Sequence, residues 1–310
     1  MKIITLTLSP ALDVHCSASD FRAEHENFAQ ISSRDAGGKG INISRALNAF
    51  GTDNTAVVVL GDENGNSFAS LLTADKINFI PISTEGAIRE NITIHPQNAK
   101  ETRLSFEGFK GDNSLVDKLD SLTNEICGEG DILALVGSVP SGITLSRLKK
   151  FVLDLKSRGI RIVIDSRSFT PADIAECSPF LIKPNEEEIV AYLGKEIGHI
   201  SEAFDAAEAI YAKGVSNVMI SLGSNGAVLA CGDGIFFANA PKIAPLSTIG
   251  AGDSSIAGFL AAYKDYLPCC ECLKYAVAYG SAACLTEGTK PPRREDIEAL
   301  LGQISVTKVK

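Results

Sequence analysis

The sequence predicts an α/β protein in which a mainly parallel sheet is accompanied by a small second sheet. Three observations support this class: apolar runs alternate with helical stretches, several runs are apolar almost throughout, and other segments alternate apolar and polar residues. A continuous run such as 131–137 is typical of a strand that is buried on both faces of a parallel sheet. The alternation of strands and helices favours βαβ units with right-handed connections.

The elements follow one another without a repeat or a linker, so we expect one domain over residues 1–310. The predicted strands of the main sheet are 2–8, 55–60, 131–137, 160–165, 179–183 and 217–222. The predicted helices lie near 40–51, 66–75, 113–127, 143–158 and 201–213, and the chain from about residue 253 is mostly helical.

Two segments, about 12–34 and 88–107, are predicted to form the small second sheet. Apolar residues alternate there with polar ones, at Leu12, Val14, Cys16, Ile92, Ile94, Leu104 and Phe106. This period of two indicates strands with one covered face and one face in water. A partial sheet inserted through loops of an α/β core can act as a lid over a site.

Composition excludes several classes of protein. The 310 residues carry 38 acidic and 29 basic side chains, a net charge of −9, which argues against a nucleic-acid binder. No apolar run approaches the roughly 20 residues of a membrane span, and the N-terminal residues resemble a strand rather than a signal peptide, so we expect a cytoplasmic protein.

The eight cysteines are then expected to be reduced. Cys269 and Cys272 form a C-x-x-C without a second pair or a histidine nearby, which favours a structural role over a metal or redox site.

The strongest local signal is the segment 247–253, Ser-Thr-Ile-Gly-Ala-Gly-Asp, which precedes a helical pattern. Gly250 and Gly252 bring bare backbone N–H groups to the start of that helix, where the helix dipole also favours an anion. Asp253 has two interpretations. It is either an ordinary N-cap or a general base beside a phosphate site, and the motif alone favours the cap.

A second signal is the glycine-rich turn Gly-Gly-Lys-Gly at 37–40, followed by a helical stripe that ends near Gly51. Glycines there permit a ligand to approach the backbone closely. The spacing differs from that of a Walker A loop, and Lys39 taken alone could be a solvated side chain.

Taken together, the two segments are similar to the signature regions of the PfkB/ribokinase family of carbohydrate kinases. The resemblance runs over the whole chain and includes four further segments, 7–13, 137–142, 181–188 and 221–227. It implies a ribokinase-like kinase domain with a three-layer α/β/α core and a β lid, which uses ATP and Mg²⁺.

The resemblance also implies roles for individual residues. Asp253 would be the base that takes the proton of the sugar hydroxyl, and the amides of Gly250, Ala251 and Gly252 would hold the charge of the transferring phosphoryl group. The nucleotide-binding residues would be Lys183, Asn185, Ser221, Gly223 and Gly226. Asn185 and Glu188 would place Mg²⁺, mostly through water. The sugar-binding residues would be Asp13, Gly38, Lys39, Asn42, Arg89, Arg103 and Ser138.

Arg89 and Arg103 bear on the choice of sugar, because guanidinium groups suit phosphate and a neutral sugar would gain little from them. The chain is most similar to the phosphosugar branch of the family, which implies fructose 1-phosphate as acceptor and fructose 1,6-bisphosphate as product. Tagatose 6-phosphate and fructose 6-phosphate are the alternatives, followed by a neutral sugar or nucleoside, and last by a sensor without activity. Arg103 stands where the fructose 1-phosphate kinases of that branch commonly carry an acid, and it points partly toward fructose 6-phosphate or another phosphosugar. Ser9 and Ser247 also depart from the common pattern. Free lid edges predict a homodimer that pairs through the lid.

Overall fold

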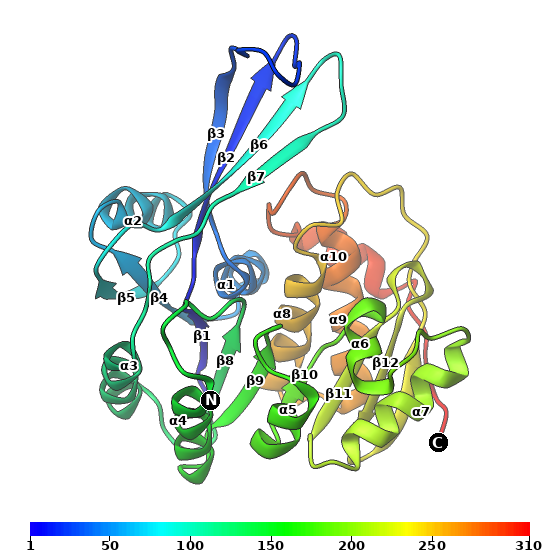
Figure 1. Ribbon diagram of the computed structural model, residues 1–310. Coiled ribbons are helices and arrows are strands. Elements are labelled where there is room, and N and C mark those ends of the chain that lie inside the picture. Colours follow the sequence, from blue (N-terminus) through cyan, green and yellow to red (C-terminus); the bar gives the residue numbers. More distant parts are fainter.

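The computed structural model describes residues 1–310 and contains a large sheet with helices on both faces and a small sheet that projects from it (Figure 1). The parallel part of the large sheet consists of β1 (Ile3–Thr7), β4 (Thr55–Gly61), β5 (Phe79–Thr84), β8 (Ile132–Val136), β9 (Arg161–Asp165), β10 (Leu181–Ile182) and β11 (Asn217–Ser221). The strands β12 (Ala227–Cys231), β13 (Gly234–Ala238) and β14 (Val306–Lys308) extend it in antiparallel pairing. The order is β14-β13-β12-β11-β10-β9-β8-β1-β4-β5.

The predicted α/β class is confirmed, and the predicted strands of the main sheet correspond to β1, β4, β8, β9, β10 and β11. The strand β5 and the β12–β13 hairpin were not predicted. The chain after residue 253 is mostly helical, as predicted, but it also contains the short strand β14, which was not predicted. That strand has three residues at a sheet edge, two of them exposed, and so carries no periodic signal.

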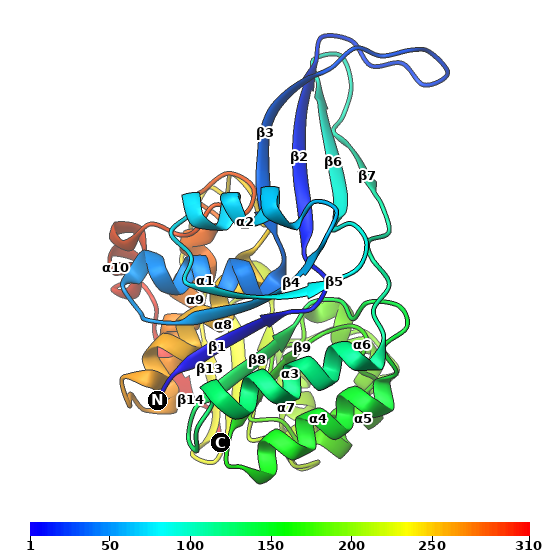
Figure 2. The same cartoon turned by 90° about the vertical axis from the view of Figure 1, so that its left-hand side faces the viewer.

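Ten helices connect the strands: α1 (Lys39–Phe50), α2 (Gly65–Ala74), α3 (Asn113–Ile126), α4 (Leu145–Ser157), α5 (Pro171–Cys177), α6 (Glu186–Leu193), α7 (Ile200–Tyr211), α8 (Ala251–Lys264), α9 (Cys269–Ala283) and α10 (Arg294–Leu301). The central strands contribute side chains to two separate cores, one on each face of the large sheet. In β8, Leu133 and Leu135 pack toward α3–α7, whereas Ile132 and Val136 pack toward α1, α8, α9 and α10 (Figure 2). This gives the three layers expected of the fold.

The small sheet consists of β2 (Ala11–Ala18), β3 (Gln30–Gly37), β6 (Arg89–Pro96) and β7 (Thr102–Ser105), in the order β3-β2-β6-β7. Strands β2 and β6 are parallel, and the outer pairs are antiparallel. Figures 1 and 2 show that it stands away from the helical layers. No helix of the protein is both long and apolar enough to cross a membrane.

The two faces of the small sheet differ from the expected pattern of burial. Val14 and Cys16 are buried as predicted, but Leu104 and Phe106 are 48% and 53% exposed. On the other face, the polar Asn91 and Thr93 are buried. The polar residues Asp13, Thr93 and Arg103 of this face line a cavity, so hydrophobicity alone did not identify the covered face. Part of the apolar face is left without a neighbour in the monomer.

Candidate active site

The start of α8 lies at the carboxyl edge of the parallel strands and presents backbone donors to it. Gly250 precedes the helix with a φ of 79°. The N–H groups of Gly250, Gly252 and Asp253 donate no hydrogen bond within the protein, and that of Ala251 makes only a 3.4 Å bond to the carbonyl of Thr248. Unpaired amides at the positive end of a helix form an anion site.

The carboxyl group of Asp253 lies beside these amides and is nearly covered, with the residue 7% exposed. Its Oδ2 accepts a hydrogen bond of 2.8 Å from Nδ2 of Asn42 on α1. The side chain makes no capping bond, so the N-cap interpretation is wrong: Gly250 occupies the cap position. Burial raises the pKa of Asp253 to about 6, and the charge of Asp165 adds to this effect against the opposing influence of Asn42, Lys39 and Lys183. A carboxyl group poised near neutrality suits a general base.

Lys39 at the start of α1 contacts Asp165, the last residue of β9. The Nζ to Oδ2 distance is 2.8 Å, and the Asp165 side chain is 6% exposed. Burial alone would lower the pKa of Lys39, but the charge of Asp165 and their hydrogen bond raise it, as do the charges of Asp253 and Glu188. Lys39 is therefore held as a cation near Asp253 and is not a freely solvated side chain. Gly38 precedes it with a φ of 139°, which favours glycine.

Asp165 was missed in the sequence analysis although a signal was present. It is an acidic residue at the carboxyl end of a predicted parallel strand, which is where ligands of α/β sheets bind. The predicted strand 160–165 ended on this residue, but no motif drew attention to it.

The predicted nucleotide-binding residues lie together at the ends of β10 and β11. Asn185 pairs with Ser221 in a parallel bridge. Gly223 begins a 3₁₀ turn, and Gly226 has a φ of 106° where a Cβ would lie 2.0 Å from the carbonyl oxygen of Ala238. This turn therefore admits only glycine at position 226.

Lys183 connects this group to the anion site. Its side chain is buried, and a Cβ placed on Gly252 would lie 3.0 Å from its Nζ. The ammonium group therefore lies against the amides at the start of α8, where negative charge would be transferred. A buried lysine without an ion pair is costly unless an anion binds beside it.

Asn185 and Glu188 form a capping box at the start of α6. Oδ1 of Asn185 accepts from the N–H of Glu188 at 2.8 Å, and Oε2 of Glu188 accepts from the N–H of Asn185 at 3.2 Å. Oε1 of Glu188 also accepts from Nε of Arg167 at 3.2 Å. Glu188 and Asp165 supply the carboxylate oxygens that Mg²⁺ prefers. Oδ1 of Asn185 already accepts a hydrogen bond from Glu188. These residues therefore fit a Mg²⁺ ion that they contact through water better than one that they coordinate directly.

Three of the predicted sugar-binding residues, Asp13, Arg89 and Arg103, form a second group on the polar face of the small sheet. Oδ1 of Asp13 accepts from Nδ2 of Asn91 at 2.8 Å and faces a guanidinium nitrogen of Arg103 at 3.2 Å. Arg89 donates to Oγ of Ser9 at 2.9 Å. Burial lowers the pKa of Arg89, which the charge of Asp13 opposes and that of Arg103 reinforces. The two arginines thus lie close enough to act on one anion, whereas Lys39 belongs to the group around Asp253.

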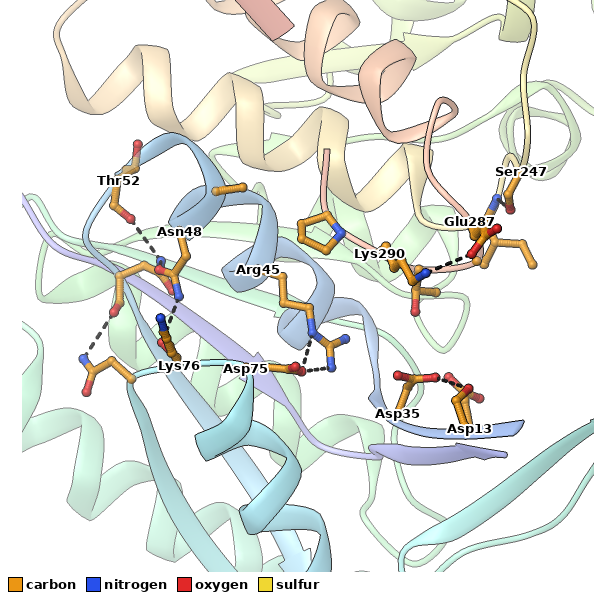
Figure 3. Close-up of a pocket in the computed structure, with 18 of the residues that line it drawn as sticks. Asp13, Asp35, Arg45, Asn48, Thr52, Asp75, Lys76, Ser247, Glu287 and Lys290 are labelled. Carbon is orange, nitrogen blue, oxygen red and sulfur yellow. Dashed lines mark hydrogen bonds and ion pairs between the residues drawn. The ribbon is translucent and has the colours of Figure 1, made fainter. Parts of the chain in front are cut away.

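A cavity of about 1300 Å³ runs from this polar face along α1 (Figure 3). Asp13 and Asp35 lie at one end near Glu287 and Lys290, and Arg45 lies further along, paired with Asp75. Asp253, Asn42 and Lys39 are outside its lining. The cavity therefore reaches Asp13 and Arg103 of the predicted sugar-binding residues but not the group around Asp253. Ser138, which follows β8, is exposed and makes no side-chain hydrogen bond.

The chain is similar to known carbohydrate kinases over most of its length. A family model described as pfkB family carbohydrate kinase matches residues 16–296. The 1-phosphofructokinase of Bacillus subtilis is 30% identical over 99% of this chain and all of its own length, and that of Vibrio cholerae is 28% identical over 99% and 96%. The structure of phosphofructokinase-2 from Escherichia coli in complex with fructose-6-phosphate has a TM-score of 0.89 and 26% identity, covering 97% of this chain and 98% of that one.

Proposed function

We propose, from the premise that this chain belongs to the pfkB family of carbohydrate kinases, that its ATP-dependent phosphosugar kinase activity is directed at fructose 1-phosphate. The product would be fructose 1,6-bisphosphate. The observation that carries the mechanism is the buried carboxyl group of Asp253, held by Asn42 beside unpaired amides of α8.

Asp253 is proposed to accept the proton of the C6 hydroxyl as its oxygen attacks the γ-phosphorus of ATP. The bond from that phosphorus to the β–γ bridging oxygen breaks, and ADP leaves with the electron pair. The transferring group spreads its negative charge over oxygens that the amides of Gly250 and Gly252 can reach. Lys183, which lies beside these amides, and Lys39, which lies near Asp253, are proposed to add positive charge.

Arg89 and Arg103 are proposed to bind the 1-phosphate of the sugar, and Asp13 and Asn91 its hydroxyl groups. Asp13 already contacts Arg103 at 3.2 Å, so it also fixes the guanidinium before the sugar arrives. Gly38 and Ser138 are proposed to border the same sugar site. The nucleotide would lie along the turn from Ser221 to Gly226.

Mg²⁺ is proposed to lie with the phosphates near Glu188 and Asp165, at the oxygen donors described above. When bound, it would neutralise phosphate charge. Arg167 holds the side chain of Glu188 in place, and the capping box of Asn185 holds the start of α6.

A homodimer through the small sheet is also proposed. Exposed apolar side chains lie on its outer face and tip: Phe28, Ile31, Leu104 and Phe106. A free sheet edge beside such residues is normally paired or covered. A second copy of the chain would cover both.

The deciding experiment is an ADP-release assay with Mg-ATP and four acceptors: fructose 1-phosphate, fructose 6-phosphate, tagatose 6-phosphate and free fructose. We expect the highest kcat/KM with fructose 1-phosphate. A second candidate acceptor, fructose 6-phosphate, is favoured by the similarity to phosphofructokinase-2 and by Arg103. Preference for either 6-phosphate would leave the mechanism intact and change the acceptor. Activity on free fructose alone would contradict the assignment of both arginines.

A further inference from the structure

Two thiols and a carboxylate meet at the edge of the large sheet opposite to the candidate active site. The Sγ atoms of Cys231 and Cys269 and a carboxylate oxygen of Asp233 all lie within 4.8 Å of one another. Strand β11 runs toward the active-site edge and β12 returns, so the turn after β12 is at the far edge. Helix α8 runs from Gly250 to the same far edge, where α9 begins with Cys269.

The three groups have few competing partners. Cys231 is buried, with Sγ 3.7 Å from the carbonyl oxygen of Gly234, and neither cysteine is in a disulfide. Asp233 is exposed and forms no ion pair. Two lysines lie beside Gly234, but Nζ of Lys308 is placed over the ring of Phe236, and Lys310 pairs with acids of α7. The carboxylate is thus directed at two thiols and lacks a cation.

We propose that Cys231, Asp233 and Cys269 bind a zinc ion. Zinc prefers a tetrahedral set of thiolate, imidazole and carboxylate donors, whereas Mg²⁺ and Ca²⁺ avoid sulfur. Two sulfurs that are each about 2.3 Å from a tetrahedral ion are about 3.8 Å apart, so the observed separations require only small side-chain movements. Binding releases the two thiol protons to solvent. The exposed side of Asp233 provides the entry path, and water completes the fourth position.

The proposed ligands differ from the C-x-x-C that the sequence displays. Cys272 is fully buried, and its thiol is directed at the carbonyl of Leu267 at 3.5 Å. Cys231 and Asp233 precede Cys269 by more than 30 positions, and only the packing of α9 on the β12–β13 hairpin brings them together. Spacing along the chain therefore could not indicate this site.

The test is a titration of the reduced, metal-free full-length protein with Co²⁺, followed by displacement with Zn²⁺. We expect one equivalent of Co²⁺ to give a sulfur-to-cobalt charge-transfer band and tetrahedral d–d bands, and one equivalent of Zn²⁺ to remove them. A chromophoric chelator in competition then gives the Kd for Zn²⁺. Zinc should also raise the Tm of the wild-type protein.

Three variants and one control define the ligands. Cys231→Ser, Cys269→Ser and Asp233→Asn should each weaken Zn²⁺ at least ~10-fold. Cys284→Ser, at the other end of α9 and half-buried, should leave the Kd unchanged. Asp233 is exposed, so its variant folds even if that of the buried Cys231 does not. Unchanged affinity in Asp233→Asn and Cys269→Ser, or no cobalt–sulfur band in the reduced protein, would overturn the proposal. So would a Cys231–Cys269 disulfide that re-forms in place of metal binding.

Discussion

Replacing Asp253 with Asn tests the proposed base and has two effects of opposite sign. Asn has the same shape, and its amide oxygen can still accept the hydrogen bond that Asn42 donates to Oδ2 at 2.8 Å. It cannot accept the proton of a hydroxyl group. Positioned general bases contribute about 10²–10⁴ in rate, which corresponds to about 3–5 kcal/mol in the barrier. We therefore expect kcat to fall by that factor while the Kd for ATP stays the same.

The stability of the same variant should rise at neutral pH. The pKa of Asp253 is about 6 in the folded protein against 3.8 for an ordinary aspartate, mainly because of burial. Because the folded pKa is the higher one, wild-type stability falls as the pH increases from about 4 to about 6 and stays reduced above it. A difference of about 2 pKa units between the folded and the unfolded protein corresponds to about 3 kcal/mol of stability that the wild type loses at neutral pH. Asn does not ionise, so the variant keeps this stability.

The two effects are measured by the ADP-release assay and by urea unfolding at pH 7.5 and pH 4. The stability gain of Asp253→Asn should approach about 3 kcal/mol at pH 7.5 and shrink to below ~1 kcal/mol at pH 4. A capping residue would instead lose about 1 kcal/mol of stability and keep most of its activity. A kcat within tenfold of wild type, or a variant that is less stable at pH 7.5, would refute the assignment.

Three further predictions concern the sugar, the metal and the dimer. Arg89→Ala should raise KM for the phosphorylated sugar at least ~10-fold with little change in kcat, whereas Arg34→Ala, an exposed arginine on the same sheet, should change neither. Glu188→Gln should raise the Mg²⁺ concentration for half-maximal activity ~10-fold in a Mg²⁺ titration at saturating ATP, without changing KM for the sugar. If the proposed dimer forms through the small sheet, Leu104→Asp should sediment as a monomer in sedimentation velocity, because it places a charge on that interface. A monomeric wild type would contradict that interface.

Much of the fold could be predicted because the strands of a parallel sheet are buried on both faces. Their apolar runs, as in β8, are visible without any knowledge of their neighbours. The edge strands were missed for the converse reason. Strand β14 owes its structure to pairing with β13 and has almost no apolar signal of its own.

The candidate site was predictable where its residues are local in sequence. Gly250, Gly252 and Asp253 lie in one turn, so one motif indicates both the anion site and the acid. Asp165 was missed because its importance comes from contact with Lys39, 126 positions away. The pKa of Asp253 likewise depends on burial by several elements, which no local pattern conveys.

The proposed zinc site and Asp253 lie near opposite ends of α8, whose 14 residues span about 21 Å. A structural change passes along a helix only if that helix has two alternative arrangements. Helix α8 is instead packed against α9 within one core. Zinc should therefore stabilise the fold without changing catalysis: we expect a higher Tm with kcat and KM unchanged within twofold. Steady-state kinetics with and without one equivalent of Zn²⁺, in wild type and in Asp233→Asn, measures this directly. A zinc-dependent kcat that disappears in Asp233→Asn would mean that the far end of α8 does move, and that the anion site at its start is not held rigidly.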